Sequence, residues 1–164
     1  MKKPWLVILH FALSILVLFD ASNAQTTSPS SPDRNSTTIN KASGTFDVKL
    51  NPLPAYNQED KNIGRMSSDK QFHGDLEGTS KGEMLNFARS AYVAIEKVSG
   101  SLKGRAGTFA LQHSGTMDHG KPQLMIMVVP DSGTGQLTGL AGTMNIMIAP
   151  DGKHSYDFSY TLPQ

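Results

Sequence analysis

The chain has 164 residues, with 15 Lys and Arg against 14 Asp and Glu, so its formal net charge is +1. This length suits one folded domain, and a balanced charge without a basic block excludes the electrostatic pattern of a nucleic-acid-binding protein. Cysteine is absent, which excludes disulfides, thiolate chemistry and a lipid anchor on an N-terminal cysteine.

Residues 1–24 have the pattern of a secretory signal peptide. Lys2 and Lys3 precede an apolar run at 5–19, and small residues at 22–24 suit a signal peptidase. A permanent membrane anchor is the alternative, but the run is short for a membrane span. We therefore expect cleavage after Ala24 and a soluble exported protein, periplasmic or secreted, with no membrane contact after cleavage.

Residues 25–43 are rich in Ser, Thr, Pro and Asn and contain almost no large apolar side chain. Such a segment cannot bury enough apolar surface to offset the entropy of ordering, so a disordered linker is predicted. From Gly44 apolar and polar residues alternate, and Phe46, Val48 and Leu50 share one face of a first predicted strand. The folded domain is therefore expected at 44–164.

Further strands are predicted near 63–72, 76–85, 90–99, 108–117, 124–129, 143–149 and 154–162, separated by turn residues. Pro52 and Pro54 are expected to end the first strand, and a short helical turn within 83–88 is an alternative. About eight short, evenly spaced strands predict an all-β sandwich or barrel. A closed antiparallel meander β-barrel is favoured, because closure removes exposed sheet edges.

A glycine phrase occurs three times in the chain. Its full form is GSLKGRAGTF at 100–109, and similar wording is found at 74–82 and 135–144. An apolar residue between glycines, followed by residues that favour strands, predicts a strand, a tight turn and a second strand. Glycine inside a strand also marks bends and close backbone approaches, so the phrase predicts corners of a curved sheet.

Polar side chains predicted to point into the barrel are the candidate ligand-binding residues, namely Tyr92, Glu96, His113 and Tyr156. Alternation around Phe109 places His113 on the inner face, on the strand expected to pair with that of Glu96. A buried glutamate needs a partner or stays protonated, so a contact between Glu96 and His113 is expected. With Tyr92 nearby, the pair suits acid–base chemistry and equally a buried polar network without chemistry.

A weaker candidate is the row of carboxylates along the second hairpin, Asp69, Asp75, Glu77 and Glu83. Two of them sharing a proton would suit acid-dependent hydrolysis, but a solvated face together with Lys70 and Lys81 is the favoured interpretation. No residues have a convincing spacing for metal ligands, and the glycine phrases do not precede helices. Neither a metal nor a cofactor is therefore expected.

Three stretches carry a resemblance to a known family: FHGDLEGTSKGEML, YVAIEKVSGSLKGRAGTFALQHSGTM and PDSGTGQLTGLAGTMNIMIAPDGKHSYDFSYTLP. As a set, they resemble the bacterial family called domain of unknown function 3224, over about residues 44–162. The resemblance implies a barrel like those of allene oxide cyclase and dirigent proteins, closed around a central cavity. Proteins of that architecture cyclise or guide reactive small molecules inside the barrel, and acid-type proteolysis has been considered for the family.

The expected function is binding of a small, largely apolar molecule inside the barrel. One alternative is an enzyme, either an isomerase or cyclase or an acid peptidase-type hydrolase, that uses the carboxylate and histidine groups. Another is a non-enzymatic module that forms homo-oligomers through its outer face at Ile95, Met125 and Met127. The expected partners are thus a small apolar ligand or a second copy of the chain.

Overall fold

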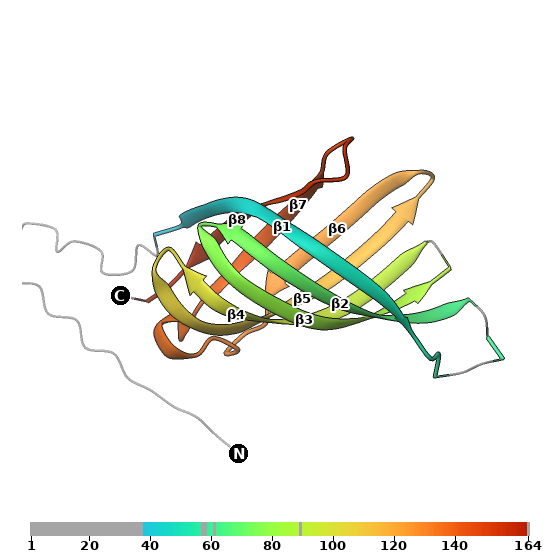
Figure 1. The fold of residues 1–164 in the computed structure, drawn as a ribbon, viewed down its shortest axis with the longest axis horizontal. Helices are drawn as coiled ribbons and strands as arrows, with labels where there is room; N and C mark the ends of the chain where they lie inside the picture. The colour runs from blue at the N-terminus through green and yellow to red at the C-terminus, as the bar shows by residue number, and fades with distance from the viewer. Residues whose placement is uncertain (1–37, 57–58, 61, 89, 164) are drawn as a thin grey trace, which may run out of the picture. The chain divides into compact units, whose positions relative to one another are not determined.

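The computed structural model describes residues 38–56, 59–60, 62–88 and 90–163. Its strands are β1 (Asn40–Leu53), β2 (Ile63–Gly74), β3 (Leu76–Phe87), β4 (Ala91–Leu102), β5 (Arg105–Asp118), β6 (Lys121–Val128), β7 (Ala141–Ile148) and β8 (His154–Thr161). Each strand pairs antiparallel with the next and β8 pairs with β1, which closes the barrel (Figure 1). The predicted all-β meander barrel is confirmed, whereas the comparison with allene oxide cyclase and dirigent proteins stays a prediction.

A short 3₁₀ helix, η1 (Gly135–Leu137), lies between β6 and β7. Within the part of the chain that the structure describes, no helix has the length and hydropathy needed to cross a membrane.

The first strand begins earlier than the sequence predicts. β1 starts at Asn40, four residues before the expected domain boundary at Gly44. The reason is that Ala42 pairs with Phe158 of β8 and is buried in the core. The end of the predicted linker is therefore wrong, while the signal peptide at 1–24 and the linker up to residue 37 lie outside the described residues.

Two further details differ from the prediction. β3 continues to Phe87, so the alternative helical turn within 83–88 is not formed. Pro52 does not end β1, which runs to Leu53 and pairs at Pro52 with Met66 of β2. A proline is tolerated there because β1 pairs with β8 only as far as Phe46. On that side of β1 no strand needs a hydrogen bond from the N–H that proline lacks.

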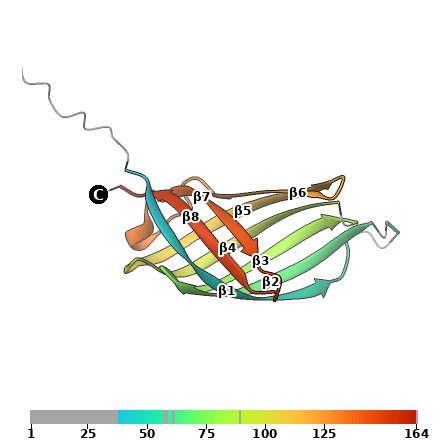
Figure 2. The same cartoon turned by 90° about the horizontal axis from the view of Figure 1, so that it is seen from above.

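The barrel wall is complete at one end only. The β7–β8 hairpin ends at the pair Ile148 and His154, level with Phe46 of β1, and β6 meets β7 at the single pair Met127 and Thr143. In Figure 2 the β3–β4 and β5–β6 hairpins extend beyond the ends of β7 and β8. The section between β1 after Phe46 and β6 before Met127, where neither strand has a described neighbour on that side, is called the open half here.

The closed end is filled by apolar side chains, and the glycine phrases contribute to it directly. Each phrase places one leucine in the core, and Leu76, Leu102 and Leu137 are at most 1% exposed. The phrase at 100–109 forms the expected tight turn, with positive φ at Lys103 and Gly104 between β4 and β5. The phrase at 135–144 instead begins with the 3₁₀ helix, so the hairpin predicted there is wrong.

Candidate functional site

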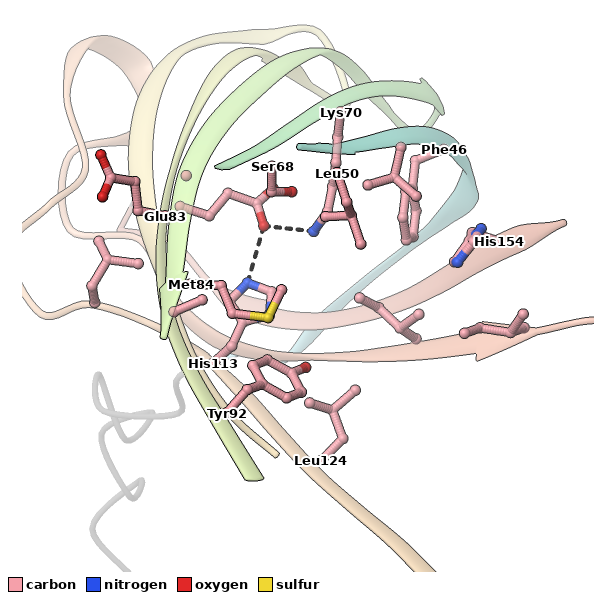
Figure 3. Close-up of a pocket in the computed structure, with 17 residues that line it drawn as sticks. Phe46, Leu50, Ser68, Lys70, Glu83, Met84, Tyr92, His113, Leu124 and His154 are labelled. Carbon is pink, nitrogen blue, oxygen red and sulfur yellow. Dashed lines mark hydrogen bonds and ion pairs between the residues drawn. The ribbon is translucent and has the colours of Figure 1, made fainter. Parts of the chain in front are cut away.

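Glu96 is the centre of a buried polar cluster formed by Lys70, Ser80, Glu96 and His113. Its side chain is 3% exposed, and its Oε1 accepts a hydrogen bond from Ser80 Oγ at 2.5 Å. Its Oε2 lies 2.5 Å from Lys70 Nζ and 3.0 Å from His113 Nε2 (dashed lines in Figure 3). The expected contact between Glu96 and His113 is confirmed.

Strand register brings this polar cluster together from β2, β3, β4 and β5. Lys70 lies opposite Ser80, and Glu96 lies opposite Gly82. A Cβ at Gly82 would lie 3.0 Å from Glu96 Cα and 2.7 Å from the carbonyl oxygen of Ile95. The glycine therefore allows β3 and β4 to approach closely where the glutamate turns inward.

Lys70 does not belong to a solvated hairpin face, contrary to the prediction. Its side chain is 8% exposed, and its Nζ lies 5.0 Å from the ring centroid of Phe46 and 5.8 Å from that of Phe72. These distances allow cation–π attraction in addition to the ion pair with Glu96. The sequence did contain the signal, because Lys70 and Phe72 are two residues apart on one strand and so share a face.

Two carboxylates of the second hairpin, Glu83 and Asp75, form ion pairs with basic side chains near the surface. Glu83 lies 2.6 Å from Arg65, and its side chain is 64% exposed and points away from the cavity in Figure 3. Asp75 lies 3.5 Å from Lys103. These contacts agree with the solvated role preferred for the carboxylates.

The surroundings of Glu96 keep it ionised. Burial by itself would raise the pKa of its carboxyl, but the interactions with His113, Lys70 and Ser80 together lower that pKa to about 2. Burial, and secondly the charge of Glu96, raise the pKa of Tyr92, so its hydroxyl keeps its proton. The approach of His113 Nε2 to Glu96 is not aligned as a hydrogen bond, and this buried nitrogen has no other described partner.

The polar cluster borders a cavity in the open half of the barrel. The inner section has a volume of about 180 Å³ and is lined by Lys70, Glu96 and His113 together with mainly apolar side chains. An outer section of about 500 Å³ lies beside the β3–β4 turn, at the end of the open half that we call the mouth. The two sections share Leu50, Met84, Tyr92, Leu124 and Ile148, so we treat them as one channel that leads from the mouth to the polar cluster.

Apolar side chains along this channel point inward and are nevertheless exposed. The exposed fractions are 45% for Leu50, 46% for Met117, 41% for Leu124 and 66% for Ile148. Their exposure follows from the missing wall between β1 and β6, which leaves the inner face of the sheet open to water.

The two candidate tyrosines lie in different parts of the interior. Tyr92 lines both sections of the channel, and its hydroxyl makes no hydrogen bond with a described residue. Its ring lies against Gly115, where an added Cβ would be 2.2 Å from Tyr92 Cε1. Tyr156 lies in the closed end, where its hydroxyl accepts a hydrogen bond from the Leu76 N–H at 2.9 Å. The structure therefore brings Tyr92, Glu96 and His113 together and separates Tyr156 from them.

Comparison with known proteins identifies the family. The family model described as "Protein of unknown function (DUF3224)" matches residues 42–160. The chain belongs to the DUF3224 family. A crystal structure of a DUF3224 protein of unknown function from Shewanella oneidensis MR-1 has a TM-score of 0.70 and 47% sequence identity, covering 77% of this chain and 99% of that one. No curated protein matches the chain.

The outer face of this DUF3224 barrel carries exposed apolar residues at two of the three positions predicted from the sequence, Ile95 and Met125. Ile95 is 55% exposed and Met125 is 59% exposed, while Met127 is half-buried. Self-association through this face stays a prediction. Among the described residues, no group of three His, Cys, Asp or Glu is arranged to hold a metal ion.

Proposed function

We propose that this DUF3224 protein binds a small, largely apolar molecule in the channel of its open half. The observation that carries the proposal is the row of inward-pointing side chains, among them Leu50, Leu124 and Ile148, that remain 41% to 66% exposed. Covering apolar surface contributes about 25 cal/mol per Å², so a ligand that covers these residues is stabilised by the same effect that fills the closed end. An apolar channel with a few convergent polar groups is typical of small-molecule sites.

Binding has more support than catalysis by the polar cluster. A carboxylate whose pKa lies near 2 is a weak base at neutral pH, and both oxygens of Glu96 already have partners. Acid-type hydrolysis would need two carboxylates close enough to share a proton, whereas Glu83 and Asp75 are paired with basic residues.

The proposal is tested with N-phenyl-1-naphthylamine, an uncharged probe whose fluorescence rises in apolar surroundings. Leu124 lines both sections of the channel, so Leu124→Trp fills the entrance, whereas the neighbouring Met125 points outward and is 59% exposed. We expect saturable binding by the wild type and by Met125→Trp, and a loss of about tenfold or more for Leu124→Trp. Urea unfolding of each variant checks that the fold is kept.

Absence of saturable binding by the wild type would overturn the proposal. Equal affinity of the two tryptophan variants would also overturn it, because the probe would then be bound outside the channel.

A further inference from the structure

We infer that the ligand of this channel is an uncharged molecule whose apolar body carries a carbonyl-type acceptor oxygen. The inference rests on the proposed function and names the chemical class of its ligand. It is carried by the absence of charge along the outer section, by the charge balance of the inner section and by the hydrogen-bond donors left over there.

The outer section offers no counter-charge to a charged ligand. None of the described residues that line it is Asp, Glu, Lys, Arg or His, and its polar groups are hydroxyls and amides such as those of Asn86, Thr116 and Gln123. A charged group loses hydration in such surroundings without gaining an ion pair, which is costly. An uncharged ligand enters without this loss.

The buried charges of the inner section balance each other, and Glu83, whose backbone strand also lines it, is paired with Arg65. Lys70 and Glu96 form an ion pair in which both side chains are at least 92% buried. For a ligand carboxylate the attraction to Lys70 is offset by repulsion from Glu96, and for a ligand ammonium the reverse holds, so neither charge gains enough to replace its lost hydration. An uncharged head group loses less hydration and is therefore favoured.

The inner section contains hydrogen-bond donors that the described residues leave without an acceptor. The Glu96 oxygens accept from Ser80 and Lys70 and contact His113. The Lys70 ammonium has three N–H groups, of which the bond to Glu96 uses one, and the protonated Tyr92 hydroxyl has no described partner. A carbonyl oxygen complements these donors, whereas a pure hydrocarbon would desolvate them without compensation.

The test compares three ligands of nearly equal size: 2-acetylnaphthalene, 2-ethylnaphthalene and 2-naphthoate. Each is titrated into the protein loaded with N-phenyl-1-naphthylamine, and the displacement of the probe yields its affinity. We expect the ketone to bind about three- to tenfold more tightly than the hydrocarbon, since one hydrogen bond in a buried site contributes on this scale. The carboxylate is expected to bind most weakly.

Two tyrosine variants test whether the Tyr92 hydroxyl causes the preference for the ketone. Tyr92→Phe keeps the ring beside Gly115 and removes the hydroxyl, so the preference for the ketone over the hydrocarbon should fall severalfold. Tyr156→Phe removes a hydroxyl in the closed end, away from the channel, and should keep the preference.

Tightest binding of 2-naphthoate would overturn the inference, as would equal affinities of the ketone and the hydrocarbon. In both cases the probe still binds, so the proposed function stands. If the probe itself does not bind, the proposed function fails and the inference fails with it.

Discussion

Glu96 contacts side chains from β2, β3 and β5. Its carboxylate neutralises the charge of Lys70, the one lysine among the described residues that line the inner section. Lys70 Nζ lies between this carboxylate and the rings of Phe46 and Phe72. A buried ion pair adds little stability relative to apolar residues of similar size, but removing one partner leaves an uncompensated buried charge. Loss of the Glu96 carboxylate is therefore expected to lower the stability of the fold, whether or not a ligand is bound.

The first prediction concerns the removal of this charge. Glu96→Gln should lower the free energy of unfolding by about 3 kcal/mol, because Lys70 then keeps a buried charge without a counter-ion. Glu83→Gln is the matched control, since the pair of Glu83 with Arg65 is largely exposed and should contribute less than about 1 kcal/mol. Urea unfolding followed by circular dichroism measures both, and small, equal losses would contradict the buried pair.

The second prediction concerns pH. In the folded protein the pKa of Glu96 is about 2, below its usual value of 4.5, so the folded state favours the carboxylate. The stabilisation is complete above about pH 4.5 and is lost as the pH falls toward 2, where the folded state is protonated as well. Its size is about 3 kcal/mol.

This loss is isolated by comparing the wild type with Glu96→Gln at each pH, because the other carboxylates are common to both proteins. The difference in unfolding free energy should narrow as the pH is lowered through this range. A difference that stays constant would mean that Glu96 does not titrate between these limits.

At the scale of elements, the pairing of β4 with β5 fixes the position of the Tyr92 side chain in the channel. Tyr92 lies opposite Gly115 in the register, and its ring covers the place where a side chain at 115 would begin. An aromatic residue opposite a glycine is a recognised way of holding register in a sheet. This cross-strand pair therefore sets where the Tyr92 hydroxyl lies in the channel.

The third prediction tests this pair. Gly115→Ala places a Cβ at 2.2 Å from Tyr92 Cε1, so the ring must move, and the free energy of unfolding should fall by about 1 to 3 kcal/mol. In a Tyr92→Ala background, the same substitution should cost much less, because the clash is gone. A double-mutant cycle measures the coupling, and additive effects of the two changes would show that the ring does not rest on Gly115.

At the scale of the whole molecule, the barrel divides into a packed end and an open half because its strands differ in length. β1 and β5 have 14 residues each, whereas β7 and β8 have eight each. Small barrels are usually filled by their own side chains, and here this holds only as far as the short strands reach. The channel is the part of the interior that the β7–β8 hairpin does not cover.

The fourth prediction concerns export and is a proposal that rests on residues 1–24. Protein recovered from the exported fraction of its own host should begin at Gln25, as measured by N-terminal sequencing and intact mass. Recovery of a chain that still begins at Met1 would contradict cleavage. Native mass spectrometry of the same sample tests for a retained uncharged molecule, with protein refolded from urea as the empty reference.

Much of this arrangement follows from local patterns. Alternation with a period of two places Phe46, His113 and Phe158 on the inner face, and the turn residues locate the strands to within a few positions. The contact between Glu96 and His113 was predictable because both lie on the inner face of strands expected to pair. Lys70 was equally predictable by its parity with Phe72, but its charge favoured a solvated interpretation.

Other features depend on contacts between residues far apart in the chain. Alternation gives the face of a side chain but not its height along the barrel, so it could not separate Tyr156 in the closed end from Tyr92 in the channel. Height depends on the register of all eight strands and on where the β7–β8 hairpin stops beside β1. The open half, and with it the channel above Glu96, was therefore decided by tertiary pairing, because no local pattern encodes the absence of a neighbouring strand.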